Sequence, residues 1–330
     1  MNKVTTLVCM LVFPGIFCCT GDKQPLLPSI SGKAGDVTIV INKAEWNTEV
    51  GEEFRRIFDS SYEMLPQYEP VFDVINVTHS AFGNVFKSQR NIVITEISPS
   101  NKKPGIKVRR DVWAKPQIVI DIYAGNDDAL VSLLKGNDKK IITLLDEMER
   151  KRLMDVYRRN QDQYIVQKIR KKHNVSVIIP KGYKLDVDSA DFAWISVEEG
   201  EITQNILIYH YDYTDDSTFT SDYLIAKRDE FLKKYVSGTI QGSYLTTEKE
   251  FKPIFSEYSL RGERYVAELR GLWRMEEGIL MGGPFVNITT LDEKRNRVVT
   301  VEGFVFAAGH KKRNFMRQIE AIVYSFDFNY

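Results

Sequence analysis

The sequence predicts an α+β protein with two strand-rich halves, in which mainly antiparallel sheets are each covered by helices. Three observations support this fold class. Runs rich in Val and Ile alternate with amphipathic helical segments along the chain. A short polar connection, "TTLDEKRNRVV", separates two strand-like runs, as expected for antiparallel neighbours. The segments "GDVTIVINKAEW" and "HNVSVIIPKGYK" open the two halves in a similar way, which suggests a distant internal duplication.

The first half begins with a strand of the buried type at 36–41, followed by a helix at 45–58. Trp46, Val50 and Phe54 recur every four residues in this helix, so they form one apolar face. Further strands rich in Val and Ile are predicted at 72–78, 91–97, 106–114 and 117–124.

A long helical region is predicted from 127 to 173. Ile141, Leu145 and Met148 mark its apolar face, and the segments between them are highly charged. The run Gly136-Asn137-Asp138 disfavours a continuous helix, so we expect two helices here.

The second half repeats the alternation of strands with helices. Its helices are predicted at 220–238, with Gly238 just past the end, and at 310–326. Its strands are predicted at 174–183, 192–200, 204–213, 253–260, 264–275, 284–291 and 297–308.

The first residues of the chain have the pattern of a lipoprotein signal peptide. Lys3 precedes an apolar run from Val4 to Phe17, which is shorter than the roughly 20 residues of a membrane-spanning helix. Cys19 follows the small residue Cys18 and precedes polar residues, so it is the expected site of lipid attachment. Several acyl chains on one residue would hold the protein stably at a membrane. An ordinary cleaved signal peptide is the alternative.

The leader and the polar segment behind it set the predicted organisation of the chain. We expect a signal peptide at 1–18, a flexible tether at 19–35, an N-terminal α+β half at 36–174 and a C-terminal α+β half at 175–330. Cleavage before Cys19 leaves no other cysteine, which excludes disulfides, a thiolate nucleophile and cysteine-ligated zinc. The formal net charge is zero, so no global field favours nucleic acid.

Familiar catalytic motifs do not occur in the sequence, which has no GxSxG, HExxH, Walker A or GxGxxG pattern. His210 is the histidine of most interest, because strand alternation places it on one face with Asp212. This pair is a weak candidate for metal binding or acid/base chemistry. The alternative, which we favour, is a strand end that leads into an acidic turn.

Asp186, Asp188 and Asp191 lie close together in "LDVDSADF", which resembles part of a calcium loop. The EF-hand pattern requires Gly at its sixth position and Glu at its twelfth, where this sequence has Asp191 and Val197. A solvated turn is therefore the favoured interpretation, and we predict no metal and no cofactor.

The stretch "LRGLWRMEEGILMGGPFVN" combines several glycines with aromatic and basic residues. Glycines allow the backbone to approach a ligand closely. Arg270, Trp273 and Arg274 are therefore a candidate ligand surface, and a bulged hairpin under the last helix is the alternative.

Together with "DVTIVINKAEW", "LPQYEPVFDVINVTHSAF" and "RNIVITEI", the block "RGLWRM…MGGPFVN" resembles an uncharacterised lipoprotein family of Bacteroidota, classed as a domain of unknown function. The resemblance covers nearly the whole chain after the leader. It implies a location at the cell envelope and implies no activity or catalytic residues.

These observations favour a lipid-anchored envelope protein, expected at the outer membrane, that acts as a non-enzymatic binding or assembly module. Its expected partners are the membrane, through the N-terminal lipid, and an envelope protein or a glycan. The rival hypothesis is a hydrolase of glycan or peptidoglycan that uses paired carboxylates such as Asp186, Asp188 or Asp212.

Overall fold

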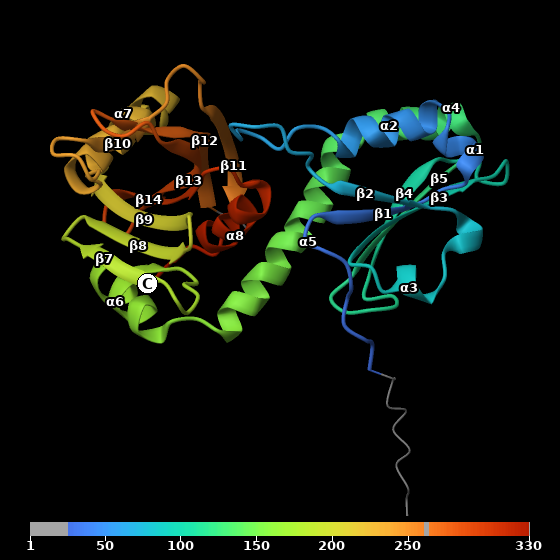
Figure 1. The fold of residues 1–330 in the computed structure, drawn as a ribbon, viewed down its shortest axis with the longest axis horizontal. Coiled ribbons are helices and arrows are strands. Elements are labelled where there is room, and N and C mark those ends of the chain that lie inside the picture. Colours follow the sequence, from blue (N-terminus) through green and yellow to red (C-terminus); the bar gives the residue numbers. More distant parts are fainter. Residues whose placement is uncertain (1–25, 261–263, 330) are drawn as a thin grey trace, which may run out of the picture.

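The computed structural model of the protein describes residues 26–260 and 264–329. Two domains lie side by side, and the long helix α5 (Asp138–Arg159) runs from one to the other (Figure 1). The predicted signal peptide and Cys19 lie outside the described residues. Of the helices in the two described ranges, none is both long enough and apolar enough to cross a membrane.

The predicted tether is described from Leu26 onward, and its later part lies against the N-terminal domain. The backbone N–H of Lys115 donates to the carbonyl of Pro28 at 2.9 Å, and that of Ser31 donates to the carbonyl of Ser88 at 2.8 Å. The segment that leads into the first strand is therefore paired with the domain from residue 28.

The N-terminal domain is built on a five-stranded sheet with the order β2-β1-β3-β5-β4. The strands are β1 (Asp36–Val40), β2 (Asp73–Val77), β3 (Asn91–Ile97), β4 (Gly105–Arg110) and β5 (Ile118–Ala124). The three pairs among β2, β1, β3 and β5 are parallel, and only β4 runs antiparallel to its neighbour. The expectation of a mainly antiparallel sheet is therefore wrong for this half, because helical crossovers rather than hairpins connect its central strands.

Helices cover one face of this sheet, and connecting segments pack on the other. On one face, residues such as Val37 and Ile39 pack against Phe54 of α2, and α4 and the first half of α5 join the same cluster. On the other face, Phe82 and Trp113 pack on Val40, Ile92 and Val119. The helical segments here are α1 (Lys43–Trp46), α2 (Glu49–Phe58), η1 (His79–Ala81), α3 (Asn84–Lys87) and α4 (Asp127–Lys135).

The region from 127 to 173 forms three helices instead of the two predicted. The break at Gly136 is as expected, and a second break precedes α6 (Gln163–His173). The carboxylate of Asp162 accepts a hydrogen bond from the N–H of Ile165 at 3.0 Å, so Asp162 caps a new helix. Helix α6 lies before residue 174 but packs with the C-terminal domain, where Ile169 and Val175 share one cluster.

The C-terminal domain is a curled antiparallel sheet of eight strands, which confirms the predicted α+β class and the antiparallel pairing for this half. The order is β10-β12-β13-β14-β9-β8-β7, and β11 also pairs with β12. The strands are β7 (Lys184–Asp188), β8 (Phe192–Glu199), β9 (Ile202–Asp212), β10 (Tyr244–Thr247), β11 (Ile254–Leu260), β12 (Arg264–Glu276), β13 (Gly282–Asp292) and β14 (Arg297–Ala307). This topology differs from that of the N-terminal sheet, so the suggested internal duplication has no counterpart in the fold.

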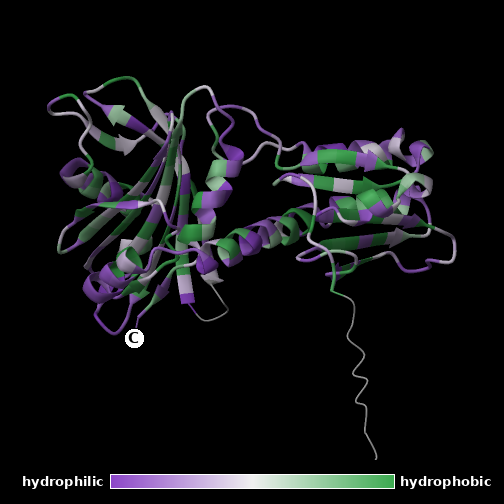
Figure 2. Cartoon of the chain, turned by 60° about the horizontal axis from the view of Figure 1, so that its bottom comes forward, coloured by the Kyte–Doolittle hydropathy of each residue, from purple (hydrophilic) through white to green (hydrophobic). Residues whose placement is uncertain are grey.

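Two helices pack on opposite faces of this sheet. Helix α7 (Ser221–Tyr235), preceded by η2 (Asp216–Phe219), covers one face with Leu224, Phe231 and Leu232. Helix α8 (Arg313–Val323) covers the other face with Met316 and Ile319. A small ribbon of β6 (Val175–Ser176) and β15 (Asp327–Phe328) completes the domain. Hydrophobic residues concentrate on the strands of both sheets, whereas the connecting loops are mostly hydrophilic (Figure 2).

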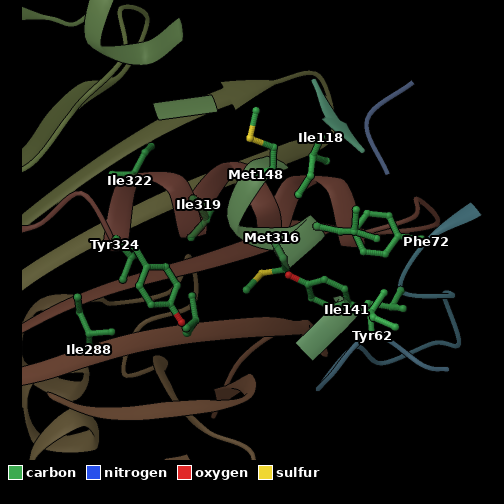
Figure 3. Packing of buried hydrophobic residues seen from close by; sticks show 14 of the residues in the cluster. Tyr62, Phe72, Ile118, Ile141, Met148, Ile288, Met316, Ile319, Ile322 and Tyr324 are labelled. Carbon is green, nitrogen blue, oxygen red and sulfur yellow. The ribbon is translucent and has the colours of Figure 1, made fainter. Parts of the chain in front are cut away.

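One continuous cluster of buried apolar residues joins the two domains. Phe72 and Ile141 from the N-terminal side pack toward Met316 and Ile319 of α8, which in turn lie over Ile288 of the C-terminal sheet (Figure 3). The loop 59–72 also reaches across, because the carboxylate of Glu69 accepts hydrogen bonds from the first backbone N–H groups of α8. The domains therefore share a core.

Candidate functional site

A large cavity lies at one end of the C-terminal domain. It has a volume of about 1090 Å³. We call it the aromatic pocket after its ring side chains, which are Tyr213, Phe219, Phe255 and Tyr265. Its charged lining residues are Asp216, Glu257, Arg264, Glu293 and Asp327. This volume, and a lining of both aromatic and charged side chains, are those of a binding site for a small molecule or an oligomer.

The chain builds this pocket from segments that are distant in the sequence. Strand β9 ends at Asp212. The segment that follows, which includes η2, carries Tyr213 and Phe219 to the β11–β12 pair. There the ring of Phe219 meets the ring of Tyr265 edge to face, with centroids 5.1 Å apart. The pocket thus forms where the start of α7 meets the β11–β12 pair.

Hydrogen bonds hold the polar side chains of the pocket in place. Tyr213 donates its hydroxyl proton to Asp216 at 2.7 Å, and Tyr265 donates to Glu257 at 2.5 Å. Arg264 binds Asp327 at 2.5 Å. Among the described residues, Ser221 Oγ and Arg264 Nη1 are buried without a hydrogen-bond partner. The pocket therefore presents carboxylates whose orientation is fixed before a ligand binds.

The predicted ligand surface of Arg270, Trp273 and Arg274 does not form. Trp273 is 2% exposed, and its indole N–H donates to the carbonyl of Val305 at 3.1 Å, so it belongs to the core. Arg274 points outward and pairs with Glu248 and Glu276. Arg270 lies on the other face of β12 from Trp273, as strand alternation requires, and it is buried under α8.

Arg270 instead lines a second cavity, of about 390 Å³, between the two domains. We call it the interdomain cavity. Arg270 binds Glu320 at 2.5 Å and Glu268 at 2.6 Å, and Tyr62 donates to Glu320 at 2.7 Å. Burial alone would raise the pKa of Glu320, but the guanidinium groups of Arg270 and Arg150 outweigh it and hold the pKa below its usual value.

His210 lies against another histidine. Its ring meets that of His173 at a centroid distance of 5.8 Å, and the Nε2 of His173 lies 3.2 Å from Asp188. Burial, followed by the charge of Arg297, lowers the pKa of His210 to about 4, so the ring is neutral at pH 7. Asp212 is exposed at the end of β9, and no hydrogen bond or ion pair joins it to His210 among the residues described.

The three predicted aspartates have three separate sets of partners. Asp186 accepts from Ser196 at 2.6 Å, Asp188 pairs with Lys172 at 3.0 Å, and Asp191 accepts from Tyr235 and Lys234. Within the two described ranges, no three or more His, Cys, Asp or Glu side chains are arranged to hold a metal ion. The aspartates act as anchors for neighbouring side chains.

Two family models match the chain, and both describe domains of unknown function. Residues 162–325 match the Domain of unknown function (DUF4837), and residues 30–158 match the Domain of unknown function (DUF8532). Together they cover both domains and meet at the end of α5. No curated protein matches the chain.

Several solved structures are weakly similar to this chain. The Ran-binding protein Mog1p of Saccharomyces cerevisiae is 7% identical, with 47% of this chain and 90% of that chain covered and a TM-score of 0.31. LpqN, involved in cell envelope biogenesis of Mycobacterium tuberculosis, is 14% identical, with 46% and 81% covered and a TM-score of 0.28. Human StAR-related lipid transfer protein 5 is 10% identical, with 53% and 93% covered and a TM-score of 0.23.

Proposed function

We propose that the protein is a non-enzymatic binding module of the cell envelope, anchored by a lipid on Cys19, and that the aromatic pocket holds a glycan. The observation that carries this proposal is the pocket itself, with its four ring side chains and its hydrogen-bonded carboxylates. The anchor rests on the sequence around Cys19.

A sugar ring has C–H faces that pack on aromatic rings and hydroxyl groups that both donate and accept hydrogen bonds. Phe219 and Tyr265 supply ring surface in the pocket, and Tyr265 is 41% exposed. Asp216 and Glu257 supply acceptors whose orientation is already fixed by tyrosine hydroxyls. Because these groups are positioned before binding, a ligand loses little further side-chain freedom when it binds.

The carboxylates that the sequence suggested for hydrolysis line neither cavity. The rival hypothesis needs two carboxyl groups that face each other across a cleft, about 5 to 9 Å apart. Asp186 and Asp188 pair with neighbouring side chains, Asp212 is exposed, and none of the three lines the aromatic pocket or the interdomain cavity.

The glycan proposal is tested by titration of soluble peptidoglycan strands and other envelope oligosaccharides into the purified protein, followed by calorimetry. We expect Tyr265→Ala to weaken binding by about tenfold, because one stacking ring is worth about 1.4 kcal/mol. Tyr164→Ala is the matched control, since Tyr164 is a 66% exposed tyrosine on α6 outside the pocket. Absence of binding by any oligosaccharide, or equal binding by the Tyr265 variant, would refute the proposal.

The anchor is tested separately, by metabolic labelling with a fatty-acid analogue. Wild-type protein should carry the label and sediment with membranes, whereas Cys19→Ala should lose both properties. Label that persists in the variant contradicts lipidation at Cys19. This result does not depend on the pocket, so the two halves of the proposal can fail independently.

A further inference from the structure

Arg150 of α5 lines the interdomain cavity, and its guanidinium donates no hydrogen bond to any other described residue. Its guanidinium carbon stacks 3.9 Å from the ring centroid of Tyr324, which fixes the plane of the group. Its Nε is buried without a hydrogen-bond partner, and its closest carboxylate oxygen, Glu320 Oε2, is 3.8 Å away. Arginine has five N–H donors, and a buried donor without a partner is unfavourable.

The carboxylates of this cavity already have stronger partners. Glu268 accepts from Tyr258 at 2.7 Å and from Arg270 at 2.6 Å. Asp146 accepts from Arg317 at 2.7 Å. Glu268 and Asp146 are thus satisfied by residues other than Arg150. Arg150 lies 3.8 Å from Glu320 Oε2 but hydrogen-bonds to none of the carboxylates in the described residues, so its guanidinium can still bind a further anion.

One face of α5 turns toward the cavity and carries a second cation. Lys139, Thr143, Asp146 and Arg150 follow one another at spacings of four, three and four residues, so they lie along the same face. Lys139 is exposed at the mouth, where the 63% exposed carboxylate of Glu63 also lies. The cavity thus has a cation at its mouth and another inside.

We infer that the interdomain cavity binds the carboxylate or phosphate group of a small molecule, with Arg150 as the principal contact and Lys139 and Thr143 as supporting contacts. A planar guanidinium held on an aromatic ring suits two-point recognition of either oxyanion. The volume of about 390 Å³ fits a small molecule rather than a polymer. The lining comes from loop 60–63, α5, β12 and α8, so the ligand would contact both domains.

Thermal unfolding of the full chain in sodium phosphate and in sodium succinate tests this inference, with sodium chloride at equal ionic strength as the reference. An anion that binds only the folded protein raises Tm in proportion to the logarithm of its concentration. We expect such a rise for wild type in phosphate, in succinate or in both. A rise in only one identifies the oxyanion.

Arg150→Gln should lower the affinity for the anion by at least about tenfold, so that a tenfold higher concentration is needed for the same rise in Tm. Arg158→Gln is the matched control, because Arg158 lies on the same helix, is 60% exposed and pairs with Asp155 at 3.4 Å. Lys139→Gln should lower the affinity for the anion to a smaller extent. Because this change is at an exposed position, the variant keeps the test decisive if the Arg150 variant does not fold. A wild-type Tm that responds to neither anion overturns the inference, as does a response that is equal in wild type and in the variant that folds.

Discussion

Two fully buried charges meet between α7 and the C-terminal sheet. Arg228 and Glu302 both have 0% exposure, and Arg228 Nη2 lies 2.7 Å from Glu302 Oε1. The guanidinium also stacks 3.7 Å from the ring centroid of Phe285, and Nη1 donates to Thr247 at 2.7 Å. The pair fixes how α7 lies on the sheet.

Replacement of Arg228 by Met should lower the free energy of unfolding by about 3 to 5 kcal/mol, because it leaves Glu302 as an uncompensated buried charge. Urea unfolding measures this loss. Lys227→Met is the control, since Lys227 pairs at 2.8 Å with the exposed Glu230 and such pairs contribute about 1 kcal/mol or less. Similar losses in the two variants would contradict the role of the buried pair.

The two neighbouring histidines, His173 and His210, make stability depend on pH. The pKa of His210 is lowered to about 4 by burial and by Arg297, and that of His173 is also lowered by burial. Between about pH 6.5 and pH 4 the unfolded chain binds protons that the folded protein does not, so stability falls as pH falls through this range. The other charged groups nearby are Lys172, Asp188 and Asp191.

For His210 alone, the expected loss between pH 7.5 and pH 5 is about 2 kcal/mol. Urea unfolding at these two values, in wild type and in His210→Gln, isolates this contribution from that of the carboxylates. The variant should lose less stability than wild type on acidification. An equal loss in the two proteins would show that the pKa of His210 does not differ between the folded and the unfolded state.

At the scale of elements, α8 approaches the sheet closely because β14 has a glycine beneath it. A Cβ atom at Gly303 would overlap Ile319 Cγ2 and crowd Val323. Gly303→Ala should therefore push α8 away from β14 and destabilise the protein by about 1 to 3 kcal/mol. Thermal or urea unfolding checks this expectation.

Gly83→Ala is the matched control for this change. An added Cβ at Gly83 has its nearest atom 3.9 Å away, and the φ of Gly83 is −97°, which suits alanine. The free energy of unfolding of the Gly83→Ala variant should therefore differ little from that of wild type. Destabilisation at Gly83 as large as that at Gly303 would show that the loss does not come from contact with α8.

Local patterns predicted most elements but not all of their pairings. Val and Ile runs placed the strands, and the spacing of Trp46, Val50 and Phe54 placed helical structure before β2. Parallel pairing of β1 was missed, although its almost continuously buried pattern is typical of a strand covered on both faces. Which strand pairs with which depends on contacts between segments distant in the sequence.

The same limit applies to the candidate site. Tyr213, Phe219, Phe255 and Tyr265 come from three separate segments, and no spacing in the sequence brings them together. Trp273 attracted attention because it lies near glycines, yet strand alternation turns it into the core. Arg270 was noted as a ligand residue, and it does line a cavity, but the loop 60–63 that faces it could not be anticipated from the sequence.

At the scale of the whole molecule, the shared core predicts that the two domains unfold together. Arg317 of α8 donates to the carbonyl of Val71 at 2.6 Å and to Asp146 at 2.7 Å, and its guanidinium stacks 4.4 Å from the ring of Phe72. These contacts link the C-terminal helix to the N-terminal domain and to α5. Calorimetry of wild type should therefore show a single cooperative transition.

Arg317→Met removes these polar contacts and leaves Asp146 without its guanidinium partner, so the N-terminal domain should become less protected. We expect hydrogen exchange at Ile39 of β1 to accelerate more than exchange at Ile288 of β13, because α8 still packs on the C-terminal sheet through Ile319. Arg274→Met, at an exposed arginine of β12, should leave both rates near those of wild type. Two transitions in the wild-type protein, or equal acceleration at the two amides in Arg317→Met, would mean that this contact does not couple the domains.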